Sequence, residues 1–249
     1  MTIHPYSQTY ILREKVWNNL LSFERRKELS KREPYITIPS MIQWSIDDVE
    51  IWNEVVFEEV ENGVLKSCIW LKNFVQITKY TWQVITIFDN HNHALYFWFD
   101  ALKRWILQPW FELIHIDEHS DLWENVYELD IDKGLENEEY LWDFTNKKCN
   151  VGNYIQPALK NGLVHTMIRI ENEFQLDEYM NYAPRRNTLL NIDLDIFSPE
   201  LGYIPEEKKM KCIKNLMKHV TFVTIATSPY FIEQWIALKK LQDILNEEI

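Results

Sequence analysis

Two short acidic motifs hold the residues of this sequence that are best suited to chemistry. HIDEHSD places Asp117, His119 and Asp121 on alternate positions after one apolar run, and NIDLDIF places Asp193 and Asp195 two apart after another. In an extended chain, side chains at i, i+2 and i+4 point to one side, so each set can converge. Carboxylates gathered in one place repel one another, and a bound divalent cation removes that repulsion. The two motifs together therefore predict a metal site.

A third segment, DNHNHAL, adds His91 and His93 to the potential ligands. Carboxylates and imidazoles without a thiolate suit an octahedral ion such as Mn²⁺ better than a structural Zn²⁺ site. The ligands are sufficient for two ions about 3.5–4 Å apart, if one carboxylate from each acidic motif bridges them and the ions activate a shared water. We therefore predict two Mn²⁺ ions as the cofactor.

These motifs need a frame that brings distant segments together. Runs typical of buried strands occur at 82–89, 110–117, 188–197 and 221–227, and helical patterns separate them. Strands that alternate with helices predict an α/β fold with a doubly wound, mainly parallel sheet flanked by helices. Ligands bind at the carboxyl ends of the strands in such sheets, which is where the motifs fall.

The helical segments can also be placed on the sequence. We expect helices over residues 10–32, in HNHALYFWFDALKRWI after the first strand, through KKMKCIKNLMKHV, and from Tyr230 or Phe231 onward. PALKNGLVHTMIRI is expected to be a helix end followed by a strand, with Gly162 near the helix C-terminus. The length suits a single domain over residues 1–249, in which residues 1–80 form an N-terminal region that, apart from the helix over 10–32, is not assigned to elements.

The overall composition narrows the classes of partner. The net charge is −12, with 38 acidic against 26 basic side chains, which argues against a nucleic-acid partner and is compatible with a cationic substrate. No apolar run is long enough to span a bilayer, and MTIHPYSQTY lacks the pattern of a secretory signal. We expect no membrane partner, a cytoplasmic location and three reduced cysteines.

Taken together, the motifs resemble those of the arginase and histone deacetylase superfamily, in which DxHxD and DxD follow successive strands of the sheet. The combination of DNHNHALYFW, HIDEHSDL, GNYIQPALKNGLV, NIDLDIF and TSPYFI is similar to an arginase-like family that includes the peptide arginases. Those enzymes convert arginine to ornithine within ribosomally made precursor peptides. The resemblance covers about residues 82–235 and implies an arginine-containing precursor peptide as the substrate and partner.

The resemblance also implies a role for each ligand. Asp117 and Asp193 would bridge both ions, His119 and Asp195 would complete one, and Asp121 and a histidine of DNHNH would complete the other.

The choice between the two histidines of DNHNH stays open. His91 comes first after the strand, whereas an alignment of HAL with the arginase HSL motif points to His93. One can be a ligand while the other supports it.

Two departures from the arginases concern the substrate. Arginases that act on free arginine hold its α-amino and α-carboxylate groups with an SGNxHG-type loop after DxHxD, and the segment DLWENVYELDIDKGLENEEYLWDF has no such loop. Their guanidinium-binding acid has no direct match either, because TIATSPY places Thr227 and Ser228 there. We predict that Glu118, Thr227 and Ser228 bind the substrate, and that Glu118 or Glu233 replaces the missing acid.

The predicted function is hydrolysis of peptidyl arginine to ornithine and urea by a binuclear manganese enzyme. The predicted catalytic residues are Asp117, Asp193, Glu118 and Glu233. An alternative is a small-molecule ureohydrolase or a deacetylase-like amidohydrolase. A third hypothesis is a metal-stabilised binding protein, which would not need both bridging positions.

Overall fold

A seven-stranded sheet forms the centre of the computed structural model, which describes residues 5–43 and 49–246. The strands follow one another across the sheet in the order β3-β6-β7-β11-β10-β8-β9. Their bounds are β3 (Ser40–Gln43), β6 (Asn73–Lys79), β7 (Gln83–Phe88), β8 (Phe111–Ile116), β9 (Val164–Ile170), β10 (Thr188–Asp193) and β11 (Phe222–Ala226). The five strands from β7 to β9 are parallel, and β6 is antiparallel to β7.

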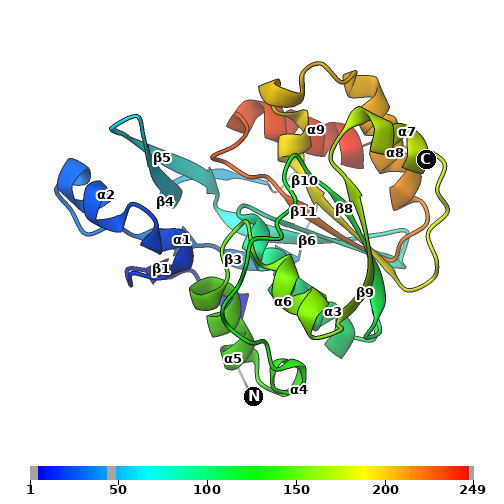
Figure 1. Cartoon of the computed structure of the whole chain (residues 1–249), viewed down its shortest axis with the longest axis horizontal. Coiled ribbons are helices and arrows are strands. Elements are labelled where there is room, and N and C mark those ends of the chain that lie inside the picture. The colour runs from blue at the N-terminus through cyan, green and yellow to red at the C-terminus, as the bar shows by residue number, and fades with distance from the viewer. Residues whose placement is uncertain (1–4, 44–48, 247–249) are drawn as a thin grey trace.

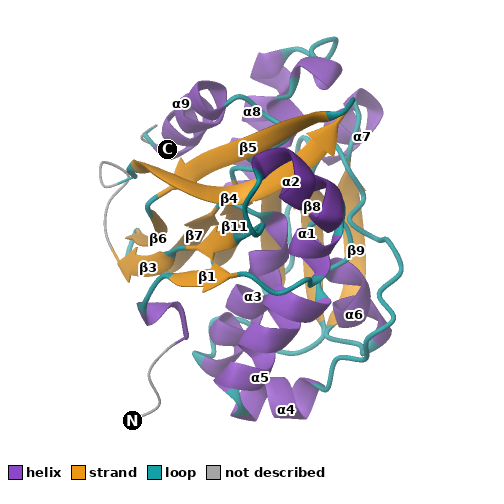
Figure 2. Ribbon diagram, turned by 90° about the vertical axis from the view of Figure 1, so that its left-hand side faces the viewer, coloured by secondary structure: helices purple, strands orange, loops and turns teal. Residues whose placement is uncertain are grey.

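Helices cover both faces of this sheet (Figures 1 and 2). Helices α3 (Ala94–Lys103) and α6 (Ile155–Lys160) lie on one face, and α7 (Glu173–Tyr179), α8 (Glu206–Met217) and α9 (Gln234–Leu245) lie on the other. The chain runs toward β9 along the first face and returns toward β11 along the second. Right-handed crossovers produce this arrangement when the chain reverses its direction across the sheet. The predicted doubly wound, mainly parallel α/β fold is confirmed.

The central strands are buried along their whole length. Every residue of β7, β10 and β11 is buried, as expected for parallel strands covered on both faces. Phe88 pairs with Ala226, Ala226 pairs with Asp193, and Ile116 pairs with Ile192. The carboxyl ends of these four strands therefore lie in one row. The two acidic motifs therefore lie beside the end of the last strand.

The remaining elements lie outside the main sheet. Two antiparallel pairs are formed by β1 (Tyr10–Leu12) with β2 (Ile36–Ile38) and by β4 (Ile51–Glu61) with β5 (Val64–Leu71). The second pair projects from the body of the molecule together with α2 (Figure 1). The other helices are α1 (Trp17–Leu20), α2 (Phe23–Ser30), α4 (Ile131–Glu136) and α5 (Glu138–Asp143). The short 3₁₀ and π turns are η1 (Pro5–Ser7), η3 (His91–His93), η4 (Phe144–Lys148), η5 (Leu194–Phe197) and η6 (Pro199–Leu201).

The helix expected over residues 10–32 is wrong. That segment contains strand β1 and two short helices, α1 and α2, which are separated by Ser22 with a φ of 53°. Strand β1 gains hydrogen bonds from β2, a pairing partner more than twenty residues away, so tertiary contacts override the local helical pattern.

Two other predicted boundaries shift. The run expected as a strand over 188–197 ends at Asp193 and continues as the 3₁₀ turn η5, because the Asp193 side chain accepts a hydrogen bond from the backbone of Asp195. The closing helix begins at Gln234, since Ser228, with a φ of 42°, starts a turn before it. Gly162 follows α6 with a φ of 72°, as its predicted place near the helix C-terminus requires.

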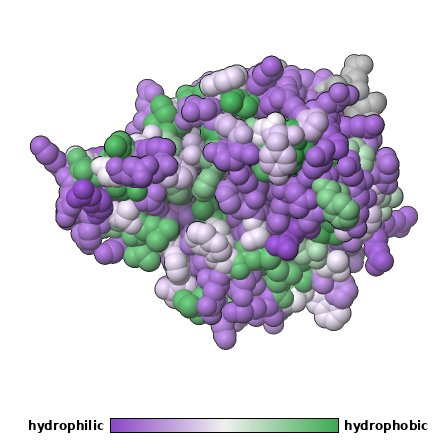
Figure 3. Space-filling model, turned by 45° about the horizontal axis from the view of Figure 1, so that its top comes forward, coloured by the Kyte–Doolittle hydropathy of each residue, from purple (hydrophilic) through white to green (hydrophobic). Residues whose placement is uncertain are grey.

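The face of the molecule shown in Figure 3 is mainly hydrophilic, with smaller hydrophobic areas among the polar side chains. Within residues 5–43 and 49–246, no helix is long and apolar enough to cross a membrane.

Candidate metal centre

His91 lies at the centre of a first group of ligand atoms. It follows β7 in the turn η3, and its Nδ1 atom is 3.0 Å from one oxygen of each of Asp117, Asp121 and Asp193. The imidazole and all three carboxylates are buried. Since the oxygens of Asp117 and Asp193 are the same distance from one nitrogen, they are no more than twice that distance apart. This spacing is compatible with the two predicted bridging positions.

A second group of ligand atoms lies around His119, whose side chain is about half exposed. Its Nδ1 atom is 2.9 Å from Oδ2 of Asp195 and 3.5 Å from Oδ1 of Asp117. The first group uses the other oxygen of Asp117, Oδ2. One carboxylate therefore takes part in both groups with a different oxygen in each, which is the arrangement of a bridging ligand.

The side chains converge, although the reason given from the sequence is wrong. An extended strand was expected to carry Asp117, His119 and Asp121, but β8 ends at Ile116 and the motif is a loop. Asp121 reaches the cluster through a left-handed backbone conformation, with a φ of 53°. The loop is held in part by the backbone N–H of His119, which donates to Asp117 at 2.5 Å.

The electrostatics of the cluster favour a bound cation. Burial and the charge of Asp117 raise the pKa of Asp121 to about 7. Burial, Asp117 and Asp193 likewise raise the pKa of Asp195 well above its ordinary value. Within the described chain, His91 Nδ1, Asp117 Oδ2 and Asp121 Oδ2 are buried and make no hydrogen bond. Buried polar atoms without partners are costly, and a divalent ion would satisfy all three. The residues present therefore fit a metal ion.

The structure distinguishes between the two histidines of DNHNH. His91 points into the carboxylate cluster, whereas His93 Nδ1 lies 2.9 Å from the hydroxyl of Tyr6 and His93 Nε2 lies 3.5 Å from Asp89. The ring of His93 packs against Phe74 at a centroid distance of 4.8 Å, and burial lowers its pKa to about 3. The geometry supports His91 as the ligand and places His93 in a separate buried network.

The sequence reasoning missed His115, Asn191 and Tyr154, which surround the cluster. His115 Nε2 is 3.3 Å from Oδ2 of Asp117, and the amide of Asn191 lies within 3.0 Å of both His115 and Tyr154. His115 and Asn191 each lie two positions before a ligand aspartate. The two-residue period of a strand, which places them on the side of those aspartates, was the signal that could have found them.

Neither acid predicted to hold the guanidinium lines the cavity beside the cluster. The carboxylate of Glu118 accepts a hydrogen bond from the Ser198 hydroxyl at 2.7 Å. Glu233 is exposed and lines a different hollow, which it shares with Phe231 and Cys68. The substrate and catalytic roles of both residues stay predictions.

Thr227 and Ser228 are buried at the end of β11. Thr227 Oγ1 donates to the backbone oxygen of Phe88 at 3.3 Å, so its hydroxyl is engaged with the neighbouring strand. Ser228 Oγ donates to Oδ2 of Asp193 at 2.5 Å and so supports a ligand carboxylate directly. Their predicted contact with substrate stays a prediction.

A cavity of about 240 Å³ opens beside the cluster. Ligand candidates and aromatic side chains line it together: His91, His119, Ser120, Asp121, Trp123, Val151, Gly152, Asp193, Asp195 and Phe231. The ring of Phe231 is 5.1 Å from that of His119, and a side chain at Gly152 would come within 3.1 Å of the Trp123 ring. The cavity thus combines a cluster of acids with two aromatic walls.

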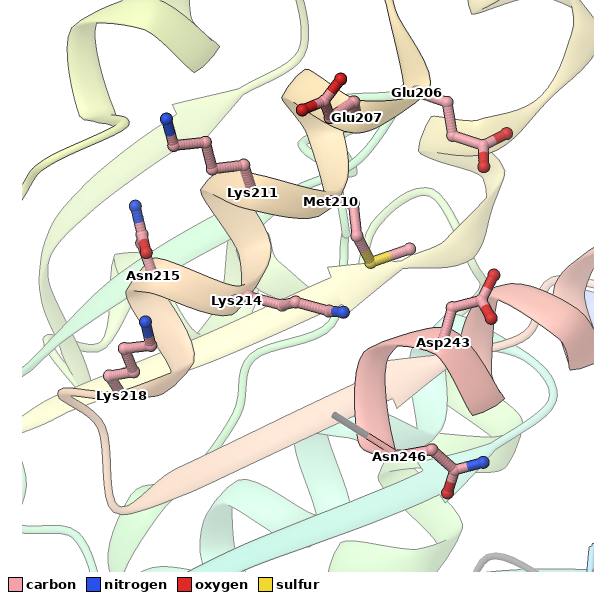
Figure 4. A pocket seen from close by; sticks show the side chains of 9 residues that line it. All are labelled: Glu206, Glu207, Met210, Lys211, Lys214, Asn215, Lys218, Asp243 and Asn246. Carbon is pink, nitrogen blue, oxygen red and sulfur yellow. The ribbon is translucent and has the colours of Figure 1, made fainter. Parts of the chain in front are cut away.

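A larger hollow of about 610 Å³ lies between α8 and α9 and shares no lining residue with this cavity (Figure 4). Lys211 and Lys214 of α8 line it together with Asp243 of α9 and Asn246. It contains no histidine among the described residues and none of the predicted site residues, so it is not part of the candidate metal centre.

The fold and the cluster define an α/β protein with a candidate two-metal centre at the strand ends. The sequence matches no protein-family model and no curated protein. Among solved structures, the chain is similar to the agmatine ureohydrolase of Thermoplasma volcanium, with a TM-score of 0.41 and 14% sequence identity. The match covers 70% of this chain and 61% of that one, so the chain spans less than two thirds of the length of that enzyme.

Proposed function

We propose that the protein is a two-metal hydrolase that releases urea from arginine within a precursor peptide and leaves ornithine. The observation that carries this proposal is the cluster of buried imidazole and carboxylate atoms that make no hydrogen bond and lie beside a cavity with aromatic walls. Mn²⁺ is the expected ion, because oxygen donors outnumber nitrogen donors among the ligand atoms.

The residues divide between two ions. One ion would be held by His91, Asp117, Asp121 and Asp193, and the other by His119, Asp117, Asp193 and Asp195. When bound, such a pair of ions lowers the pKa of a shared water and neutralises negative charge that develops during hydrolysis.

The walls of the cavity suit a flat cation. Trp123 and Phe231 line the cavity, and a cation over an aromatic face is stabilised by about 0.5–2 kcal/mol. These residues would therefore orient the guanidinium carbon toward the ligand aspartates.

The lining of the cavity favours a substrate without a free α-carboxylate. Among its described residues there is no lysine or arginine that could pair with such a group. In a peptide the α-carboxyl group of arginine is part of a peptide bond, so the cavity needs no lysine or arginine side chain to pair with it. A small amine such as agmatine also lacks a carboxylate, and the same observation supports a small-molecule ureohydrolase as the second candidate.

A mass measurement tests the proposal. Mn²⁺-loaded protein is incubated separately with an arginine-containing peptide, free arginine and agmatine, and a peptide with lysine in place of arginine is the control. Each converted arginine takes up water and loses urea, a net loss of about 42 Da. We expect this loss in the arginine peptide and an unchanged lysine peptide. Equal or faster release of urea from free arginine or agmatine would contradict the peptide assignment.

A further inference from the structure

His115 is buried beside the first group of ligand atoms and faces the same oxygen as His91. Its Nε2 atom is 3.3 Å from Oδ2 of Asp117, and His91 Nδ1 is 3.0 Å from that oxygen. The ligand atoms of these three residues all lie within 4.8 Å of one another. His115 Nε2 makes no hydrogen bond within residues 5–43 and 49–246. A second imidazole therefore stands where the first ion would be held.

The other ring nitrogen of each histidine, His91 Nε2 and His115 Nδ1, faces the same side chain, Asn191. The terminal amide of Asn191 lies 2.8 Å from His91 Nε2 and 3.0 Å from His115 Nδ1. It also lies 2.8 Å from the hydroxyl of Tyr154. An amide nitrogen has two hydrogens and an amide oxygen has two lone pairs, so either end of the amide can serve both rings. The nitrogen and oxygen ends of an asparagine are distinguished only by their hydrogen-bond network.

The two orientations of Asn191 have opposite consequences for the histidines. If the amide nitrogen faces the rings, each ring accepts there and carries its proton on the nitrogen near Asp117. If the amide oxygen faces them, both rings donate to it and direct a lone pair toward Asp117. Two lone pairs beside a carboxylate oxygen are repelled unless a cation lies between them.

We propose that His115 is a further ligand of the ion held by His91 and Asp117, and that Asn191 positions both imidazoles by presenting its amide oxygen to them. The amide nitrogen then faces Oγ1 of Thr224, which is 2.6 Å from the other end of the amide and can accept as well as donate. This inference rests on the proposed function only in requiring a bound metal, and it does not depend on the substrate.

A second imidazole changes which metals the ion site prefers. Nitrogen ligands favour Co²⁺ and Zn²⁺ over Mn²⁺ more strongly than carboxylates do. We expect the position of the first ion to select Co²⁺ over Mn²⁺ more strongly than the position around His119, which has one imidazole.

X-ray absorption of the Co²⁺-loaded unmodified protein counts the imidazoles directly. We expect three for each pair of ions, from His91, His115 and His119, and a count of two would overturn the proposal. His115→Phe should lower the affinity of one Co²⁺ ion by more than about 100-fold in calorimetry, beyond the 10- to 100-fold loss that changes to residues supporting a ligand produce. His93→Phe, the same change at the other buried histidine, is the matched control and should leave the count and both affinities unchanged.

The role of Asn191 has its own readout. In isotope-labelled protein loaded with Zn²⁺, nuclear magnetic resonance should show protons on His91 Nε2 and His115 Nδ1, and protons on the other nitrogens would overturn the proposed orientation. Asn191→Asp, which can only accept at neutral pH, should retain that pattern, whereas Asn191→Leu should lose it. If the unmodified protein binds no divalent metal, both the inference and the proposed function fail. If it binds two ions and His115→Phe binds them equally well, the inference alone fails.

Discussion

Asp193 contacts both halves of the candidate metal centre. One of its oxygens is 3.0 Å from His91 Nδ1 and accepts from Ser228, and the other accepts from the backbone of Asp195 at 2.9 Å. The residue ends β10, whose apolar side chains are buried independently of the carboxylate. Its charge therefore matters to the metal site more than to the fold.

Replacing Asp193 by Asn should abolish turnover while the protein stays folded. The change removes a bridging charge, and we expect the rate to fall at least about 1,000-fold, which corresponds to roughly 4 kcal/mol in the barrier. Asp132→Asn, an exposed acid in α4, is the control and should leave the rate unchanged. Circular dichroism checks folding, and a variant at position 193 that keeps more than a tenth of the rate would refute the bridging role.

The loop after β8 and the turn before α6 meet at the wall of the cavity. The backbone N–H of Trp123 donates to the oxygen of Gly152 at 2.9 Å, and the Trp123 ring covers the place where a side chain at Gly152 would stand. The glycine thus lets the two loops approach closely enough to form the wall.

Gly152→Val should therefore displace the Trp123 ring and weaken substrate binding. We expect KM for an arginine peptide to rise about tenfold, the size expected from losing one cation–π contact, with kcat changed far less. Gly152→Ala should have a smaller effect, because the nearest ring atom needs to move by only a few tenths of an ångström. An unchanged KM in the Val variant would exclude Trp123 as a substrate-binding wall.

Helix α2 is attached to the β4–β5 pair through buried charges. Arg26 and Glu58 are both fully buried and form an ion pair, and Glu58 is also paired with Arg32 and accepts from Ser67 at 2.9 Å. Burial lowers the pKa of Arg26, although the charge of Glu58 opposes that change. Removing one partner would leave the other charge buried without compensation.

Glu58→Ala should lower the free energy of unfolding by about 3–5 kcal/mol, the usual cost of breaking a buried ion pair. Glu61→Ala, three residues further along β4, breaks the exposed pair with Lys66 and should cost about 0–1 kcal/mol. Urea denaturation of both variants measures the difference. Equal effects would show that the buried charges do not anchor α2.

The stability of the whole molecule should depend on pH when metal is removed. The pKa of Asp121 is raised to about 7 and that of Asp195 is also raised, so the folded protein holds protons that the unfolded chain has released above about pH 4. His119 acts in the same direction at higher pH, because Asp117 and Asp195 raise its pKa to about 11. These groups therefore favour the folded state at low pH, and their contribution to the free energy of unfolding is lost as the pH rises.

Protein treated with a chelator should therefore melt at a lower temperature at pH 8 than at pH 5.5. We expect a shift of several degrees, since 1 kcal/mol corresponds to about 2–4 °C for a domain of this size. Adding Mn²⁺ should raise the melting temperature more at pH 8, where protons compete least for the carboxylates. Calorimetry at both values tests this, and a metal-free protein that is more stable at pH 8 would contradict it.

The amino-acid sequence by itself determined which residues could form the centre and which fold could hold them. Alternating strands and helices predicted the doubly wound sheet, because buried parallel strands carry continuous apolar runs that are legible locally. The positions of Asp117, Asp121 and Asp193 after such runs predicted their convergence at one edge of the sheet. These inferences needed only the apolar pattern of buried strands and the repulsion between carboxylates.

Only the tertiary structure decided which groups face one another. It separated His91 from His93, because the turn η3 directs one ring to the carboxylates and the other to Tyr6. It replaced the helix expected over residues 10–32 with strand β1 and two short helices. Each of these outcomes depends on the direction of a side chain or on a pairing partner distant in the sequence, and neither is encoded in the local pattern of residues.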